Sequence, residues 1–312
     1  VRRLRAGLSI DFLNNFKLKG SVDLENDRKP EGLEREFGYE GFNRITLSYK
    51  VKDVLGLDDL EFTYGRDSID IGQEGHTSSR HIKTVERSAI SNKVYDGRYT
   101  GFAVTGKRGD VEATLGIYSL DLSNFIGNWD AGQAVYLSTN FQALGGETTL
   151  DFIYNLDQGT ADDEAGLDYR WAASAGWNGK INSWDLMVNA IVGDNGVQTN
   201  SNREGSFYGF VFMPSKEIIQ DKLEFVARYQ YQASTRDRGI RLNSRYFRNS
   251  EQGITDLNSG RGNEHQSIYT GLNYFFCGQR SKIMTGVEHE TLDSDNGDAR
   301  ATTLWLAYRT YF

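Results

Sequence analysis

The sequence predicts an all-β fold, a transmembrane antiparallel β-barrel of about 16 strands with short turns on one side and long loops on the other. Three observations carry this prediction. Apolar and polar side chains alternate through repeated stretches of about ten residues. The connections between these stretches are alternately short and long. The chain has 34 glycines but only 2 prolines, and proline is poorly tolerated in sheets because it cannot donate to a ladder.

The first expected strand, residues 2–12, places Leu4, Leu8 and Ile10 on one face and Arg3 and Arg5 on the other. Residues 15–25 repeat the pattern after a tight turn. The other expected strands are 44–50, 60–66, 99–107, 110–120, 134–144, 148–157, 167–177, 183–193, 206–213, 222–232, 267–276, 282–292 and 302–312. The mean hydropathy of −0.56 agrees with this pattern, because lipid-facing and lumen-facing residues average out to a polar value.

The long connections are expected at 27–37, 67–96, 121–131, 157–166, 194–203 and 235–264. In membrane barrels the short turns are periplasmic and the long loops face outwards. Residues 1–312 are therefore expected to form a single outer-membrane β-barrel domain. Bacterial barrels have an even strand number, so we expect one further strand upstream of residue 1. An open edge in lipid would leave backbone groups unpaired at a cost of several kcal/mol each.

The two faces of the expected strands differ in chemistry. One face carries aromatic residues near strand ends, as in the interfacial girdles of membrane barrels: Tyr49, Tyr64, Trp184, Tyr229, Tyr231, Tyr274, Tyr308 and Phe312. The opposite face carries many ionisable groups, which a dry core cannot hold and a water-filled lumen can. Its candidate pore-lining and selectivity residues are Arg3, Arg5, Arg44, Arg170, Arg228 and Arg309.

Two long loops carry candidate functional residues. Residues 67–96 are expected to fold inward as a constriction whose cations set the local potential, although a solvated external loop is the alternative. The constriction candidates are Arg80, Lys83, Arg87 and Lys93. The loop 235–264 is expected at the outer mouth, where guanidinium groups attract anions or pair with lipopolysaccharide phosphates or acidic loops. Its candidates are Arg236, Arg238, Arg241, Arg245 and Arg248.

Several function classes are disfavoured by the composition. A net charge of −8 argues against nucleic-acid binding, which needs a basic face. The single cysteine, Cys277, excludes an internal disulfide framework. Neither the four histidines nor the Asp293–Asp298 run has the spacing of a metal site. No GxSxG elbow or phosphate-cradling glycine loop is present. We therefore expect no catalytic site, no metal and no cofactor.

Three segments together resemble the phosphate-selective porin O and P family. They are the double-arginine segment RRLRAGLSIDFLNNFKLKGSVDLE, the TVERSAISN segment with the GRYTGFAVTGKRGDVEATLGIYS hairpin, and TGLNYFFCGQRSKIMTGVEHE before a last strand ending in Phe. The resemblance implies a trimeric barrel of sixteen strands in the outer membrane, with an early loop folded inside and a strand before the double arginine. It further implies anion selectivity through lumen arginines, although no lysine cluster is evident in 67–96.

These observations favour an outer-membrane porin, a passive diffusion channel for small hydrophilic solutes or ions with an anion preference of the phosphate type. The alternative is a structural, adhesive or envelope-tethering barrel with an occluded lumen. The expected partners are outer-membrane lipid and lipopolysaccharide, small solutes or anions, two further copies in a homotrimer, and the barrel-assembly machinery, which would read the C-terminal Phe312.

Overall fold

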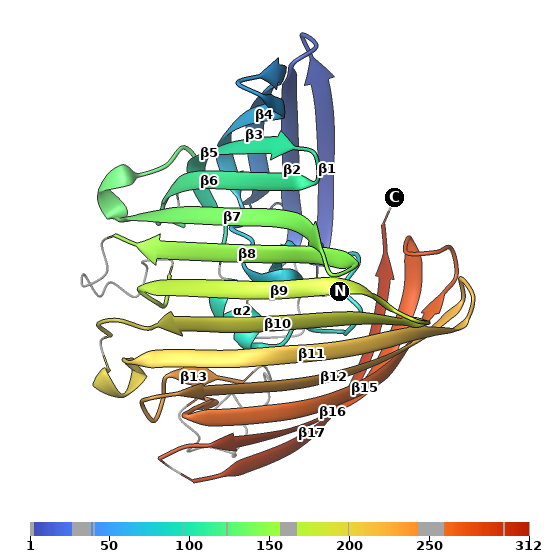
Figure 1. Cartoon of the computed structure of the whole chain (residues 1–312). Helices are drawn as coiled ribbons and strands as arrows, with labels where there is room; N and C mark the ends of the chain where they lie inside the picture. Colours follow the sequence, from blue (N-terminus) through green and yellow to red (C-terminus); the bar gives the residue numbers. More distant parts are fainter. Residues whose placement is uncertain are drawn as a thin grey trace.

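The computed structural model describes residues 3–26, 39, 41–95, 97–122, 124–156, 167–198, 200–242, 259–295 and 297–311. Fifteen strands form one antiparallel sheet that curves into a barrel wall (Figure 1). Its strands are β1 (Arg3–Phe12), β2 (Phe16–Asn26), β3 (Gly41–Val54), β4 (Leu57–Asp67), β5 (Tyr99–Arg108), β6 (Val111–Ser119), β7 (Gln133–Ala143), β8 (Gly146–Asn155), β9 (Trp171–Ile181), β10 (Trp184–Asp194), β11 (Ser206–Ile219), β12 (Leu223–Ser234), β15 (Glu264–Phe275), β16 (Ser281–Asp293) and β17 (Ala299–Thr310). The predicted antiparallel β-barrel is thereby confirmed.

Each strand of the sheet pairs with the next one along the chain, so the wall is built from successive hairpins. Two short strands, β13 (Ile240–Arg241) and β14 (Arg261–Gly262), form a separate ladder in the loop between β12 and β15, which the sequence pattern did not predict. The strand order of the large sheet ends at β1 and β17, and no ladder joins these two strands within the described ranges. They lie at opposite edges of the wall in Figure 1.

The short turns use left-handed backbone conformations. Leu55 and Gly56 have φ values of 55° and 76°, and Leu144 and Gly145 have 53° and 74°. Two successive residues with positive φ are typical of the tight turns whose twist matches that of the flanking strands. Glycine at the second position adopts this conformation without steric cost. These turns make the β3–β4 and β7–β8 hairpins compact at one end of the barrel.

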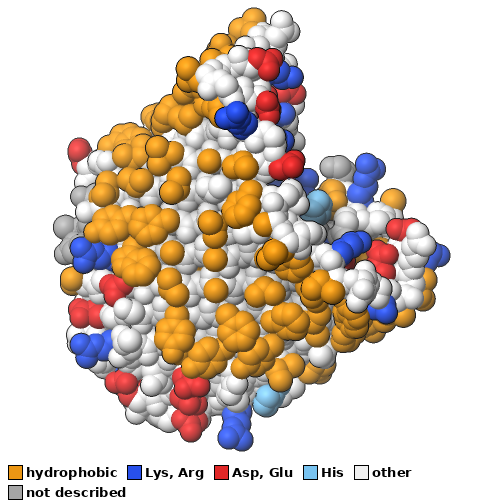
Figure 2. All heavy atoms as spheres, viewed as in Figure 1, with side chains coloured by type: hydrophobic (Ala, Val, Ile, Leu, Met, Phe, Trp, Pro, Cys, Tyr) orange, Lys and Arg blue, Asp and Glu red, His pale blue; other side chains and the backbone are white. Residues whose placement is uncertain are grey.

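The outer face of the sheet is apolar (Figure 2). On β11, Tyr208, Phe210 and Phe212 are exposed by 48%, 40% and 39%, whereas Val211 and Met213 between and beside them are buried. The same alternation places Leu304, Leu306 and Tyr308 of β17 outside, which agrees with the face predicted for Tyr308. A soluble protein rarely exposes so continuous an apolar surface. The distribution is that of a barrel whose outer face contacts lipid.

Part of the inner face of the sheet is covered by the described residues 67–95 of the predicted segment 67–96, called the inner segment below. It contains two short helices, α1 (Gly72–His76) and α2 (Ala89–Val94), which contact the strands from β8 to β13. Two 3₁₀ turns, Trp129–Ala131 and Ser201–Arg203, lie in other loops. None of the helices in the described ranges is both long enough and apolar enough to cross a membrane. The principal core of the molecule lies between the segment and the wall, on the concave side of the sheet.

Candidate functional site: the inner segment and its wall

The N-terminal end of α1 docks on β8 and β10 through backbone donors. The N–H of Gly72 donates to Oδ2 of Asp151 at 2.7 Å, and the N–H of Gln73 donates to Oδ1 of Asn189 at 2.6 Å. The first N–H groups of a helix lack partners within the helix, so these two wall side chains satisfy them. A further contact joins His76 Nε2 to Asp151 Oδ1 at 2.9 Å. The start of the segment is therefore fixed to the wall by three polar contacts.

Close approach of α1 to the wall requires a glycine on β9. A Cβ on Gly176 would lie 2.4 Å from Cγ of Gln73 and 2.7 Å from Oδ1 of Asn189. Real Cβ atoms do not approach other atoms so closely, and overpacking of this kind destabilises a core. Gly72 itself has φ of +74°, a conformation that favours glycine. Glycines on both partners thus let the helix lie directly on the sheet.

An apolar cluster anchors the rest of the segment. Ile69, Ile71, Ile90 and Val94 are at most 3% exposed and belong to the same buried cluster as wall residues such as Phe207. The hydroxyl of Tyr169 donates to the carbonyl of Val94 at 2.9 Å. Full burial of an aliphatic side chain stabilises by about 1.5–3 kcal/mol. The segment therefore packs as part of the core and not as a solvated loop.

A buried ionic network ties the middle of the segment to β12 and β16. Arg228, 1% exposed, pairs with Glu288 at 2.9 Å and with Glu74 at 3.4 Å. Its Nη1 also donates to the carbonyl of Glu86 at 2.7 Å. Glu74 accepts hydrogen bonds from the backbone N–H and the hydroxyl of Ser88. Since charges are rarely buried unless paired, each group in this network depends on the others.

Wall donors bind the carbonyls of the segment's tip. Arg309 donates to the carbonyls of Ser79 at 2.5 Å and Val85 at 2.6 Å. Lys282 donates to the carbonyl of Ile82 at 3.2 Å. The side-chain amide of Asn273 donates to the carbonyl of Lys83 at 2.8 Å. These donors satisfy backbone acceptors that have no partner in a regular ladder. The tip is thus positioned by the wall through its backbone.

Burial and ion pairing raise the pKa values of two side chains in the segment, His76 and Asp70. Burial disfavours the charged form of His76, but the hydrogen bond and the charge of Asp151 outweigh it, with Asp70 and Glu147 adding to the effect, so its pKa is raised. Burial also raises the pKa of the Asp70 carboxyl, against the opposing charge of His76. Both shifts favour binding of protons when the segment is docked.

The structure separates the predicted arginine ladder into different environments. Arg5 pairs with Asp23 at 2.5 Å and Arg44 with Asp67 at 2.6 Å, both on the inner face near β1 to β4. Arg228 and Arg309 hold the inner segment, as described above. Arg3 lies on β1, but its side chain is outside the described atoms.

The prediction for Arg170 is wrong. Its guanidinium lies over the ring of Tyr154 at 5.8 Å and donates to that hydroxyl at 3.1 Å. Tyr154 lies on the same face of β8 as the exposed Leu150 and Phe152, so it faces outwards. The chain bends at residues 168–170 before β9 begins at Trp171. This bend breaks the alternation on which the inward placement relied.

The four cations predicted for the constriction differ in their surroundings. Lys83 contacts Glu224 at 2.8 Å and Asp185 at 3.1 Å. Arg87 is buried and donates to the carbonyls of Glu74 and Thr77. Lys93 lies 4.4 Å from the centre of the Phe207 ring. Arg80 is exposed, and its guanidinium carbon lies 4.9 Å from the centre of the Tyr311 ring. Most of this positive charge is therefore already paired or packed.

The outer-mouth candidates are described only in part. Arg236 is exposed, and Arg238 pairs with Asp295 at 2.8 Å, joining two loops. Arg241 lies on β13. Arg245 and Arg248 lie outside the described residues, as does Phe312.

Four residues that hold the inner segment are not among the predicted site residues: Asp151, Asn189 and Lys282 of the wall and Glu74 of the segment. The inward position of the three wall residues follows from the alternation, but their partners lie far away in sequence. Within the described ranges, no group of three or more His, Cys, Asp or Glu side chains is placed to hold a metal ion.

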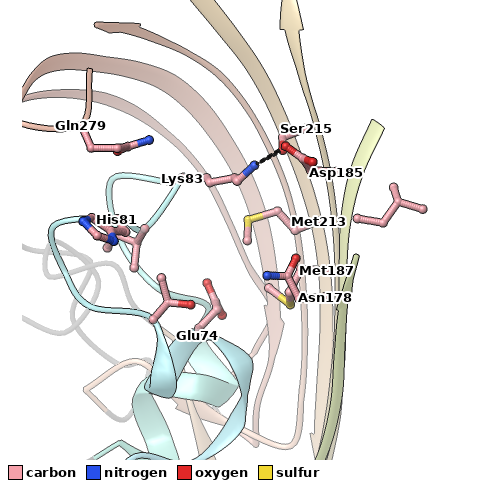
Figure 3. A pocket seen from close by; sticks show the side chains of 12 residues that line it. Glu74, His81, Lys83, Asn178, Asp185, Met187, Met213, Ser215 and Gln279 are labelled. Carbon is pink, nitrogen blue, oxygen red and sulfur yellow. Dashed lines mark hydrogen bonds and ion pairs between the residues drawn. The ribbon is translucent and has the colours of Figure 1, made fainter. Parts of the chain in front are cut away.

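A cavity of about 290 Å³ remains between the tip of the segment and the wall. Glu74, His81 and Lys83 approach it from the segment, and Asp185, Met187 and Met213 from β10 and β11 (Figure 3). Lys83 points across the cavity towards Asp185 and Ser215. The cavity therefore combines charged, amide and thioether groups in one place.

No model of a known protein family and no curated protein matches the sequence. Solved structures of similar fold include OprB of Pseudomonas putida, with a TM-score of 0.62, 11% identity, and coverage of 99% of this chain and 87% of that one. The outer membrane channel DcaP of Acinetobacter baumannii has a TM-score of 0.59 at 10% identity, with 98% and 83% covered. An anion-selective porin from Comamonas acidovorans has a TM-score of 0.56 at 11% identity, with coverage of 98% of this chain and 85% of that one. The chain has the fold of these bacterial outer-membrane porins.

Proposed function

We propose that this protein is a porin of the bacterial outer membrane, a passive diffusion channel for small hydrophilic solutes. The observation that carries the proposal is the two-faced wall: an apolar outer face and an inner face with many ionisable groups. Charges such as those of Arg5, Arg44 and Lys50 remain 34–44% exposed on the concave side. Such groups need water beside them, and the segment 67–96 narrows the space that the water occupies.

Membership of the phosphate-selective O and P family, and with it a preference for anions, is a finer form of the proposal. It is supported by the resemblance of the sequence segments and by the anion selectivity stated for the Comamonas neighbour. In this chain the preference would rest on inward cations at the solvated wall, such as Lys19 of β2, and on Arg80. Arg228 and Lys83 contribute less, because carboxylates neutralise them.

The further partners follow from the same proposal. The apolar outer face contacts lipid, and Arg236 contacts lipopolysaccharide phosphate or incoming anions. The Vibrio cholerae protein OmpT, which also has this fold, is described in a trimer form, and we propose a homotrimer here. Phe312 is proposed as the signal for the barrel-assembly machinery.

A structural or tethering barrel with an occluded lumen is the second candidate. The observation that favours it is the extent of the inner core, which joins both helices of the segment to the wall and fills part of the lumen. In this candidate the outer loops carry the function and no solute passes.

Conductance in planar lipid bilayers tests these proposals. The refolded protein is expected to give stable, ohmic single-channel currents, and absence of current in correctly folded protein would refute the channel. Reversal potentials in a salt gradient then test the finer proposal. A cation preference would refute the anion-selective form and leave the porin itself standing.

A further inference from the structure

The cavity beside Lys83 is unsuited to a free anion. The ammonium of a lysine has three donors, and Lys83 already contacts Ser215 Oγ at 2.6 Å, Glu224 Oε1 at 2.8 Å and Asp185 Oδ2 at 3.1 Å. All three donors of the Lys83 ammonium are therefore engaged, and none is left for an anion. A phosphate would have to displace one of these carboxylates.

Asp185 offers an acceptor to a positively charged group. Its Oδ2 is engaged by Lys83, whereas its Oδ1 faces the ammonium of Lys180 at 3.6 Å. The Lys180 side chain is 79% exposed, so solvent competes with this contact and the pair is weak. A solute ammonium that displaces Lys180 would gain a charge-assisted hydrogen bond.

The same cavity also contains apolar thioether groups and side-chain amides. Met187 and Met213 face it from β10 and β11 and are 6% and 7% exposed, and they are two of the three methionines in the chain. Thioether side chains adapt to the shape of an apolar group. Asn178 lines the cavity, and Gln279 also does so while its Oε1 accepts from Lys282 at 2.9 Å, which leaves the NH₂ of Gln279 as a donor for a carboxylate.

We propose that this cavity is a subsite for small aliphatic amino acids in zwitterionic form. The solute ammonium binds Asp185 Oδ1, its carboxylate accepts from amide donors, and its side chain packs on Met187 and Met213. A volume of about 290 Å³ is at the small end for ligand pockets and fits one such molecule. The inference rests on the proposed channel function and adds a solute class to it. Because a zwitterion has no net charge, its binding leaves the net charge of the lumen unchanged.

Four probes that each keep or lack one part of the solute test the subsite in the wild-type channel. Leucine is compared with 4-methylpentanoate, which lacks the ammonium, with 3-methylbutylamine, which lacks the carboxylate, and with glycine, which lacks the apolar side chain. Leucine is expected to interrupt the ion current at the lowest concentration. Loss of the bond to Asp185 should weaken the effect of 4-methylpentanoate roughly tenfold. Equal effects of leucine and 4-methylpentanoate would overturn the proposal.

Substitutions then assign the effect to the cavity. In Asp185→Asn the leucine effect is expected to fall to that of 4-methylpentanoate, whereas Glu112→Gln, an exposed inward carboxylate of β6, leaves it unchanged. Equal leucine responses in Asp185→Asn and the wild type would overturn the proposal. Conductance in plain salt shows whether each variant retains the inner segment. A channel that conducts without any leucine effect refutes the subsite alone, whereas absence of conductance refutes the porin.

Discussion

The wall formed by β1 to β4 and the wall formed by β8 to β16 follow the same inward and outward alternation, yet they use their charges differently. Arg5 and Asp23 of the first wall are 34% and 21% exposed. Arg228 and Glu288 of the second are 1% and 3% exposed and bind the inner segment. The difference shows that an inward arginine is either a solvated lumen charge or a structural anchor, depending on whether the segment covers it.

The largest effect is expected where a buried carboxylate loses its partner cation. Arg228→Leu leaves Glu74 and Glu288 buried without their cation, and loss of one partner of a buried pair costs about 3–5 kcal/mol. The free energy of unfolding, measured with denaturant in micelles, should fall by this amount. Hydrogen exchange of residues 72–94 should become faster. A variant with native stability and native exchange would show that Arg228 does not anchor the segment.

A smaller effect is expected from steric displacement of α1. Gly176→Ala places a methyl group within 2.4 Å of Gln73, and such overpacking costs about 1–3 kcal/mol. The single-channel conductance should change because the segment moves. Gly20→Ala is the matched control, since a Cβ there meets nothing within 4 Å. Equal behaviour of the two variants would argue against close docking of α1 on β9.

A modest dependence on pH is expected in the same region. The pKa of His76 is raised by Asp151, so its contribution is fully present below its usual value of about 6.5 and is lost as pH rises through the raised value. The raised pKa of Asp70 has the same sign, with its loss starting above about 3.9. The free energy of local opening of residues 72–94, measured by hydrogen exchange and corrected for the intrinsic pH dependence of amide exchange, should therefore be larger at mildly acidic pH. His76→Gln should remove most of this dependence, and a smaller opening free energy in acid would contradict it.

The smallest effect is expected at the solvated wall. Arg5→Leu breaks a partly exposed ion pair, and such pairs contribute about 0–1 kcal/mol. Stability should stay close to that of the wild type, while the reversal potential should move towards cations because one lumen cation is lost. This variant is the counterpart of Arg228→Leu. Similar losses of stability in both would remove the distinction between the two walls.

Much of the architecture was predictable because strand alternation is a local property. The predicted strands near 206–213 and 302–312 correspond to β11 and β17, and Tyr308 of β17 faces outwards as predicted. The bend before β9 was not predictable from alternation, since the pattern in 167–177 continues through it. The outward turn of Arg170 followed from that bend.

The sequence by itself determined which faces of the strands are apolar and which are polar, because side chains alternate with a period of two in any strand. Only the tertiary structure decided which inward charges stay solvated. Arg228 meets Glu74 across 154 residues, and Asn189 meets Gln73 across 116. Contacts of this separation arise because the curved wall packs around the inner segment, and no local pattern specifies them.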